Sequence, residues 1–143
     1  MNKIDFDDML IKTYELLKNN KAALDRVRSV YRYILVDEFQ DINKVQFEAL
    51  KLIANPSNNI FVVGDEDQSI YGFRGSRPDF LLEFEEYFSN TKKVLLDINY
   101  RSKGEIINIA NRLIEKNTNR YEKVIKCGQG NGAKVNYISP EDS

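Results

Sequence analysis

The sequence predicts an α/β fold with a largely parallel sheet flanked by helices. Short apolar runs, typical of strands, alternate along the chain with longer segments whose apolar residues recur at helical spacing. The most informative run is residues 33–36 (YILV), which lacks the polar alternation of a half-exposed strand. We therefore expect this strand to be buried on both faces, as strands in parallel sheets covered by helices are.

Helices are expected where apolar residues repeat every three or four positions. Asp5 is a suitable N-cap for the first helix, which is expected to end at Asn19-Asn20. The further helices are expected at residues 24–30, 42–53, 78–88 and 102–114. The buried stripe of the helix that follows Pro78 should contain Phe80, Leu81, Phe84, Tyr87 and Phe88. The last helix should open on a capping box formed by Ser102 and Glu105. Its apolar face should contain Ile106, Ile109, Ala110, Leu113 and Ile114.

Further strands are expected at residues 59–63, 93–96 and 133–138. Glycines at positions 128, 130 and 132 precede the last of these strands. A phosphate-binding glycine loop should follow a strand and open a helix, which this segment does not do. We interpret it as a turn or linker.

Composition limits the function classes. The 143 residues are enough for one domain or part of one, and 21 basic against 22 acidic residues leave no overall positive charge. Nucleic-acid binding would therefore require a local patch. The single cysteine excludes an internal disulfide, and the absence of histidine removes the commonest zinc ligand. No membrane span or signal peptide is evident, so a cytoplasmic location is expected.

Polar residues follow each of the first three predicted strands, at 37–41, 64–69 and 99–102. If the strands are parallel, these clusters meet at the carboxyl edge of the sheet, where ligands bind in open α/β folds. Asp37 and Glu38 at that edge have the pattern of a Walker B element, in which one acid holds Mg²⁺ and the other polarises the attacking water. A strand followed by a solvated turn is the alternative for this pair alone.

The second cluster continues into Tyr71, Gly72, Phe73 and Arg74. Two aromatic residues and an arginine within four positions could stack on unpaired bases, which is worth ~1–3 kcal/mol per base. The alternative is that Tyr71 and Phe73 are core residues of an ordered loop.

Taken together, residues 36–41 (VDEFQD), 63–75 (VGDEDQSIYGFRG) and 99–102 (NYRS) resemble motifs II, III and IV of the UvrD/PcrA/Rep family of superfamily one DNA helicases. The resemblance extends to residues 5–8 (DFDD) upstream and to the helix containing residues 110–114 (ANRLI) downstream. It covers essentially the whole chain and implies a RecA-like, P-loop NTPase fold for its sheet.

The resemblance also implies roles for the matching residues. Asp37 would bind Mg²⁺ and Glu38 would act as the base toward the water that attacks the γ-phosphate of ATP. Gln68 would sense that phosphate, and Arg101 would stabilise its developing charge. The resemblance further implies that Tyr100 stacks on the adenine, that Tyr71 and Phe73 stack on DNA bases, and that Arg74 contacts the strand. The partners would be single-stranded DNA, duplex junctions and the remainder of the helicase, with 3′-to-5′ unwinding. Where many members of the family have tryptophan, this chain has Phe73, a smaller stacking face.

The chain lacks the G-x-x-x-x-G-K-[ST] phosphate loop and the later family motifs. We therefore interpret residues 1–118 as the latter part of the first motor domain (1A), with 1–32 a helical lead-in. Residues 119–143 would be a linker and the start of the second motor domain (2A). Such a fragment is expected to be inactive alone. Without the P-loop strand its sheet would expose an edge that favours self-association.

Three other hypotheses remain open. A metal-dependent nuclease could use Asp37, Glu38, Asp41, Asp65 and Asp67, but it would leave the glutamine and the aromatic residues without a role. A non-catalytic module could bind single-stranded DNA or dock a partner. The helicase could also belong to the recombination helicase–nuclease branch rather than to the repair helicases.

Overall fold

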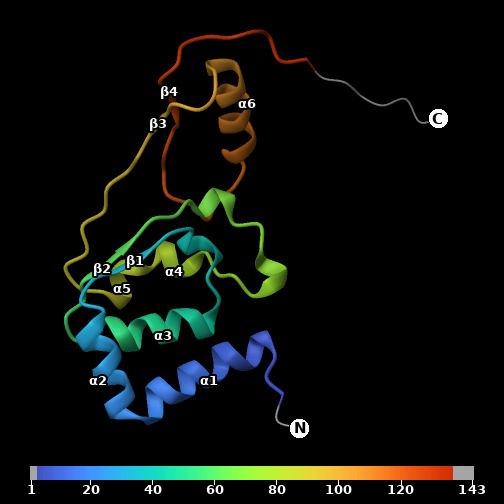
Figure 1. The fold of residues 1–143 in the computed structure, drawn as a ribbon. Coiled ribbons are helices and arrows are strands. Elements are labelled where there is room, and N and C mark those ends of the chain that lie inside the picture. Colours follow the sequence, from blue (N-terminus) through green and yellow to red (C-terminus); the bar gives the residue numbers. More distant parts are fainter. Residues whose placement is uncertain (1–2, 137–143) are drawn as a thin grey trace. The chain divides into compact units, whose positions relative to one another are not determined.

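A computed structural model describes residues 3–136 of the chain. The chain divides into two compact units, Met1–Thr91 and Lys92–Ser143, and each is described by itself (Figure 1). The helices and strands of the first unit are α1 (Phe6–Asn19), α2 (Lys21–Val30), β1 (Ile34–Val36), α3 (Lys44–Ala54), β2 (Ile60–Val62), α4 (Asp79–Leu82) and α5 (Phe84–Tyr87). Its short 3₁₀ helices are η1 (Phe39–Asp41), η2 (Glu66–Gln68) and η3 (Gly72–Arg74). The second unit contains β3 (Ile98–Asn99), α6 (Gly104–Ile114) and β4 (Lys126–Cys127).

The first two helices are delimited by side-chain caps. Asp5 caps α1 as expected, because its Oδ1 accepts a hydrogen bond from the Asp8 N–H at 2.7 Å. Asn20 ends α1 and at once caps α2, since its Oδ1 accepts from the Ala23 N–H at 3.0 Å. This second cap explains why α2 begins at Lys21 rather than at the expected Leu24.

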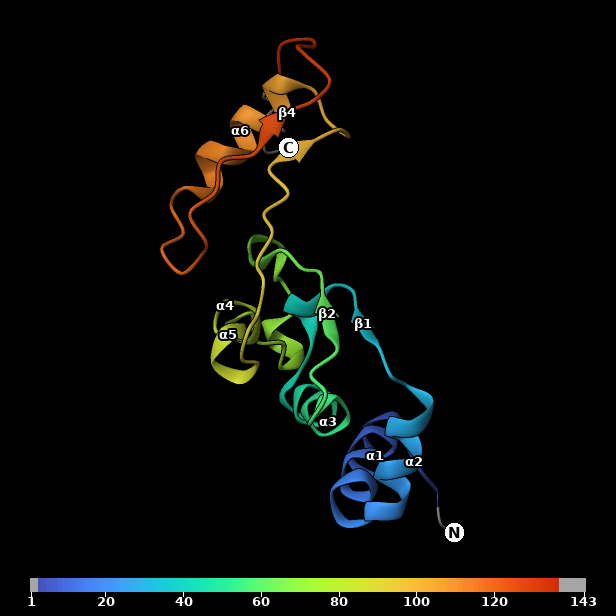
Figure 2. The same ribbon diagram turned by 90° about the vertical axis from the view of Figure 1, so that its left-hand side faces the viewer.

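The strands of the first unit are parallel, as predicted. Ile34 of β1 lies opposite Ile60 of β2, and Leu35 lies opposite Phe61. The prediction that β1 is buried on both faces is wrong, because Leu35 is 75% exposed and Phe61 is 63% exposed. The residues on either side of Leu35 and of Phe61 in the two strands are partly buried. Helix α3 lies beneath the two strands in both ribbon views (Figures 1 and 2). One face of this pair is therefore covered and the other is apolar but open. Self-association through the sheet stays a prediction.

Phenylalanine rings form the centre of the first unit. Phe47 of α3 stacks on Phe80 of α4 with ring centroids 4.1 Å apart, and Phe39 meets Phe84 edge-on at 5.5 Å. Phe39 and Phe47 are at most 1% exposed, and both ring arrangements are ones that aromatic pairs favour. The core therefore fixes η1, at the carboxyl end of β1, against the helices.

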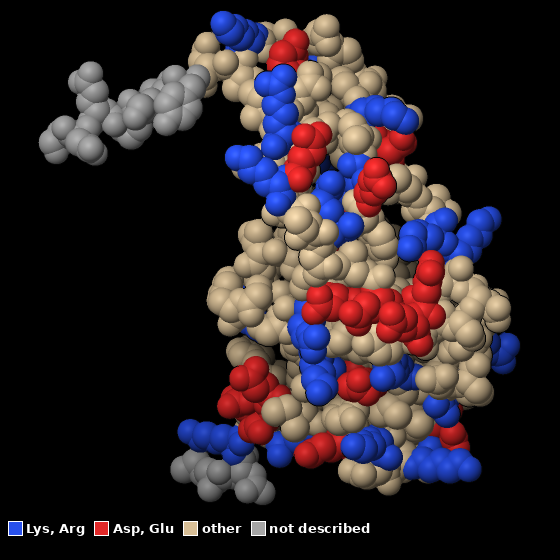
Figure 3. All heavy atoms as spheres, turned by 180° about the vertical axis from the view of Figure 1, so that it is seen from behind, with Lys and Arg blue, Asp and Glu red and all other residues tan. Residues whose placement is uncertain are grey.

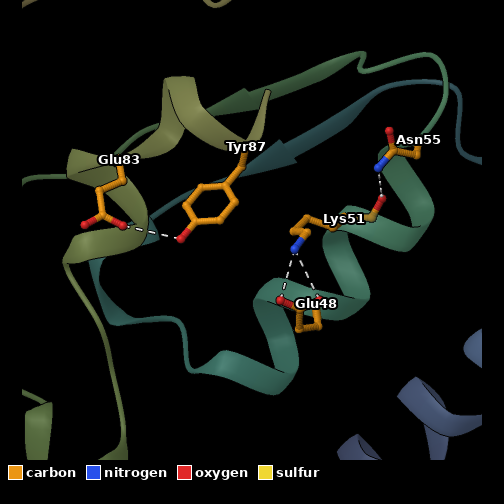
Figure 4. Close-up of polar contacts among 5 residues, drawn as sticks. All are labelled: Glu48, Lys51, Asn55, Glu83 and Tyr87. Carbon is orange, nitrogen blue, oxygen red and sulfur yellow. Dashed lines mark hydrogen bonds and ion pairs between the residues drawn. The ribbon is translucent and has the colours of Figure 1, made fainter. Parts of the chain in front are cut away.

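Polar contacts close the outer side of this core between α3 and α5 (Figure 4). Lys51 donates to Glu48 at 3.1 Å, and its ammonium lies over the rings of Phe47 and Tyr87. The Tyr87 hydroxyl donates to Glu83 at 3.3 Å. Desolvation raises the pKa of this hydroxyl above its ordinary value, and the negative charge of Glu83 raises it further.

Two of the predicted elements take a different form. The helix expected after Pro78 is divided into α4 and α5, and its stripe is buried except at Tyr87. The prediction of a strand at residues 93–96 is wrong, because this segment pairs with no strand in the part of the chain that the structure describes, and Val94, Leu95 and Leu96 are exposed. The strand begins later, at Ile98, where it finds a partner in β4.

In the second unit, β3 pairs in parallel with β4 and α6 connects them. Lys126 of β4 donates to Asp97 at 2.6 Å, and this hydrogen bond lowers the pKa of the Asp97 carboxyl. The predicted capping box of α6 is wrong. The N-cap is Lys103, whose side chain does not cap the helix, while the Glu105 carboxylate accepts from the Gly132 N–H at 2.6 Å.

The face that α6 buries also differs from the expected one. Ile107, which was not among the predicted apolar positions, is 5% exposed, whereas Ile106, Ile109 and Leu113 are at least half exposed. The Asn111 side chain donates to the Ile125 carbonyl at 2.9 Å, so this side of α6 faces the segment that leads into β4.

The predicted strand at residues 133–138 is absent from 133–136, and its last two residues lie outside the described part of the chain. Among the described residues, no helix combines the length and apolar character needed to cross a membrane.

The aromatic core yields the first prediction. Phe47→Ala should lower the free energy of unfolding by about 3–5 kcal/mol, because it leaves a cavity among rings that cannot fully collapse. Phe6→Ala is the matched control, since Phe6 is 86% exposed and its loss should change stability by less than about 0.5 kcal/mol. Urea denaturation followed by circular dichroism measures both, and equal effects would contradict the assigned core.

Candidate functional site

The parallel pairing of β1 and β2 brings two polar loops together. The first loop comprises residues 37–41 and the second comprises residues 64–77. The Val63 N–H donates to the Val36 carbonyl and the Phe39 N–H donates to the Val63 carbonyl, both at 2.9 Å. The ladder thus continues beyond the strands, and the first two polar clusters meet at one edge, as predicted.

The first loop makes a sharp turn at Glu38. This residue has φ 51° and ψ 44°, the left-handed conformation that residues other than glycine seldom adopt. Such a backbone costs on the order of 1–3 kcal/mol and is found where surrounding contacts enforce it, often at functional sites. The Asp37 carboxylate accepts from the Glu38 N–H at 3.0 Å and supports the turn.

A buried glutamine connects the two loops. Gln40 is only 1% exposed, its Nε2 donates to Glu38 Oε2 at 2.8 Å, and its Oε1 accepts from the Asp65 N–H at 3.0 Å. A Cβ placed on Gly64 would lie 2.8 Å from that Oε1. The absence of a side chain at Gly64 is thus what lets the second loop approach the glutamine.

The second loop begins with a hydrogen-bonded acidic turn. Asp65 accepts from the Gln68 side-chain amide at 2.7 Å and from the Asp67 N–H at 3.1 Å. Carboxylate oxygens of Asp65, Glu66 and Asp67 all lie within 4.8 Å of one another. Both oxygens of Asp65 accept hydrogen bonds from the turn itself, so this group organises the backbone around Gln68.

Asp37 has the chemistry that Mg²⁺ requires. It is exposed at the sheet edge, and among the described residues its Oδ2 has no hydrogen-bond partner. A carboxylate oxygen of this kind is a hard ligand suited to Mg²⁺, which is bound by one or two carboxylates together with nucleotide phosphates. The donor chemistry therefore fits a divalent cation at Asp37.

The tip of the second loop carries an exposed aromatic platform, defined here as Tyr71, Phe73 and Arg74. The two rings lie 6.0 Å apart, and the Arg74 guanidinium lies 5.4 Å from one centroid and 5.3 Å from the other. Phe73 is 79% exposed and Tyr71 is 38% exposed. The alternative that these rings belong to the core is therefore wrong.

The part of the second loop that follows the platform is fixed to the rest of the first unit. Asn43 and Ser76 form an isolated antiparallel bridge, and the Arg77 N–H donates to the Ile42 carbonyl at 3.2 Å. Gly75, at φ 81°, ends η3 in a conformation that glycine adopts without strain. The platform is thus exposed at its tip and anchored at its base.

The third polar cluster belongs to the second unit. Asn99 Oδ1 accepts from the N–H groups of Arg101 and Ser102, each at 2.9 Å, and Tyr100 is 66% exposed. The expectation that this cluster ends a strand of the same sheet as the other two is wrong, because β3 pairs with β4. The approach of Arg101 to Glu38 and Gln68 stays a prediction.

Comparison with known proteins identifies the family. The model of the UvrD/REP helicase N-terminal domain matches residues 1–89. This chain belongs to the UvrD/REP helicase family. It is 41% identical over 134 residues to the ATP-dependent DNA helicase PcrA of Staphylococcus epidermidis, covering 94% of this chain and 18% of that protein. It is 39% identical over 137 residues to the ATP-dependent DNA helicase Rep of Buchnera aphidicola, covering 96% of this chain and 21% of that protein.

The chain thus spans about a fifth of the length of these relatives. The family match covers the whole of the first unit up to α5, including both loops and the platform. The residues brought together at the sheet edge therefore lie in the part of this UvrD/REP family chain that the family model covers.

The face of this family member seen in Figure 3 shows no continuous basic area. Lys and Arg side chains lie there in separate groups, and Asp and Glu side chains form a continuous row across the middle. This agrees with the near-balance of charges in the sequence. Binding of a polyanion would therefore depend on local groups such as the platform.

Sequence reasoning missed Gln40 as a site residue. Its position between Phe39 and Asp41 gave no sign that an uncharged amide would be almost fully buried. The available signal was Gly64, which directly follows the second strand. A glycine there permits close approach by a side chain from the neighbouring loop.

The fit between Gly64 and Gln40 yields the second prediction. Gly64→Ala should destabilise the fold by about 1–3 kcal/mol, because the added methyl group must displace the Gln40 side chain or the nearby Leu81. Gly72→Ala is the control, since a Cβ at Gly72 has no neighbour within 4 Å. Thermal unfolding of both variants measures the difference, and an unchanged midpoint for Gly64→Ala would contradict the close approach.

Proposed function

We propose that this chain is part of an ATP-dependent DNA helicase that couples ATP hydrolysis to translocation on single-stranded DNA and to duplex unwinding in the 3′-to-5′ direction. The observation that carries the proposal is the edge of the first sheet. There, a carboxylate pair, a glutamine turn and an exposed aromatic platform follow one another within two hydrogen-bonded loops. Relatives that carry the name ATP-dependent DNA helicase support it.

The first loop carries the hydrolytic chemistry. Asp37 binds Mg²⁺, which when present offsets negative charge on the ATP phosphates. Glu38 acts as the base that takes a proton from the attacking water. Its Oε1, which has no hydrogen-bond partner among the described residues, is the oxygen available for this step. Gln40 holds the other oxygen at 2.8 Å and so fixes the direction of the carboxylate.

Gln68, Tyr100 and Arg101 complete the nucleotide site in this proposal. Gln68 senses the γ-phosphate, Arg101 stabilises the charge that develops on it, and Tyr100 stacks on the adenine. The Asn99 side chain fixes the turn that contains Tyr100 and Arg101. Residues 1–118 then form the latter part of the first RecA-like domain, and residues 119–143 lead into the second.

The platform binds single-stranded DNA in this proposal. Tyr71 and Phe73 offer ring faces to unpaired bases, and Arg74 adds a positive charge beside them. Stacking is tolerant of base sequence, as a motor that moves along any strand requires. A non-catalytic single-strand-binding module is the second candidate, favoured by the exposure of the platform.

Hydrolysis provides the third prediction. In the helicase that contains this segment, Glu38→Gln should lower the DNA-stimulated ATPase rate by about 10²- to 10⁴-fold, because the amide cannot accept the proton of water. ATP binding should persist, since the Mg²⁺ ligand Asp37 is unchanged. A phosphate-release assay and nucleotide titration measure these quantities. The 143 residues alone should show no ATPase activity, and activity that Glu38→Gln abolishes would refute this last point.

DNA binding provides the fourth prediction. In the helicase that contains this segment, Phe73→Ala should weaken the binding of an oligo-dT strand by about 5- to 150-fold. This corresponds to ~1–3 kcal/mol for one lost stacking contact. Phe6→Ala is the matched control, because Phe6 is 86% exposed against 79% for Phe73 but lies on α1 outside the platform. Fluorescence anisotropy of a labelled strand measures both. Equal affinities for the two variants would remove the platform from the DNA site.

A further inference from the structure

A continuous series of hydrogen bonds connects the two loops. It runs from Glu38 Oε2 to Gln40 Nε2 at 2.8 Å, from Gln40 Oε1 to the Asp65 N–H at 3.0 Å, and from Asp65 Oδ2 to Gln68 Nε2 at 2.7 Å. The Ser69 hydroxyl also donates to the Gln40 carbonyl at 3.4 Å. Gln40 is thus bonded to the second loop through its side chain and its backbone.

The geometry requires an amide at this position. One end of the Gln40 side chain faces a carboxylate, which only accepts hydrogen bonds, and the other end faces an N–H, which only donates. Glutamate would offer acceptors at both ends and place a second negative charge against Glu38. Methionine has a similar length but would remove the donor to Glu38 Oε2 and the acceptor for the Asp65 N–H, so both hydrogen bonds that connect the loops would be lost.

We propose that Gln40 is a positioning residue that fixes Glu38 and Gln68 relative to each other and thereby couples ATP hydrolysis to DNA binding by the second loop. This inference rests on the proposed function. Gln40 is 1% exposed, so it acts through the residues that it contacts. Gln40 bonds to both Glu38 and the Asp65 N–H, so a displacement of the Glu38 carboxylate moves the backbone of Asp65. The Asp65 carboxylate in turn orients the Gln68 side-chain amide. The platform follows Gln68 within the same loop, so its position depends on the same contacts.

The test compares Gln40→Met with Gln46→Met in the helicase that contains this chain. Gln46 is an exposed glutamine that belongs only to the cap of α3, where its Oε1 accepts from the Asn43 N–H. Gln40→Met should lower kcat for ATP by about tenfold with KM unchanged, because the base is misplaced while nucleotide binding is kept. It should also reduce the ratio of DNA-stimulated to basal rate. Gln46→Met should alter stability but leave that ratio as in the wild type.

A second variant keeps the inference testable if Gln40→Met fails to fold. Gln40→Glu retains an acceptor for the Asp65 N–H but loses the donor to Glu38, so it should show the same loss of stimulation. In the chain itself, the NMR signal of the Gln68 side-chain amide should shift in either Gln40 variant and stay in place in Gln46→Met.

The outcomes separate this inference from the function on which it rests. If Glu38→Gln retains full ATPase activity, the proposed function fails. If Glu38→Gln is inactive while Gln40→Met and Gln40→Glu keep the wild-type stimulation ratio, the coupling role of Gln40 is overturned and the function stands. If the ratio falls in Gln46→Met as well, the effect is one of general stability and the coupling role is likewise rejected.

Discussion

The parallel register of β1 and β2 is the constraint on which the site depends. Because Ile34 lies opposite Ile60 and Val36 opposite Val62, the segments that follow β1 and β2 leave the sheet at the same edge and in the same direction. An antiparallel pairing would place the two loops at opposite ends. A slip by one residue would exchange the covered and exposed faces and separate Glu38 from the second loop. The polar site is therefore set by backbone hydrogen bonds between apolar residues.

Gln40 turns this proximity into a defined geometry. A buried amide lowers stability unless its donor and acceptor both find partners, and here each does so across the gap between the loops. The left-handed backbone of Glu38 also indicates a defined geometry, since such strain persists only where neighbouring contacts enforce it. The phenylalanine core holds η1 from below through Phe39. Strain, burial and packing thus act together on the residue proposed as the base.

Several local features were predictable from the sequence, whereas most non-local ones were not. The Asp5 cap and the helical periodicity of α3 depend on neighbours along the chain, and both were predicted correctly. The chemical roles of residues 37–41 and 64–75 stay predictions. The strand expected at residues 93–96 failed because an apolar run becomes a strand only where a partner pairs with it, and that partner, β4, aligns with Ile98 instead. The burial of Leu35 depends on what covers the sheet, and the role of Gln40 on a loop 25 residues away.

The exposed platform is kept ordered by contacts in addition to those that fix Glu38. Tyr71 and Phe73 leave apolar surface in water, which is unfavourable, yet Arg74 covers part of both rings and the Asn43–Ser76 bridge fixes the loop at its base. A loop that is already ordered loses less conformational entropy when it binds a partner than a free one does. In the proposed function, the rings would bind bases without first having to become ordered. Since Gln40 bonds to the start of the same loop, the order of the platform and the position of Glu38 have a common origin.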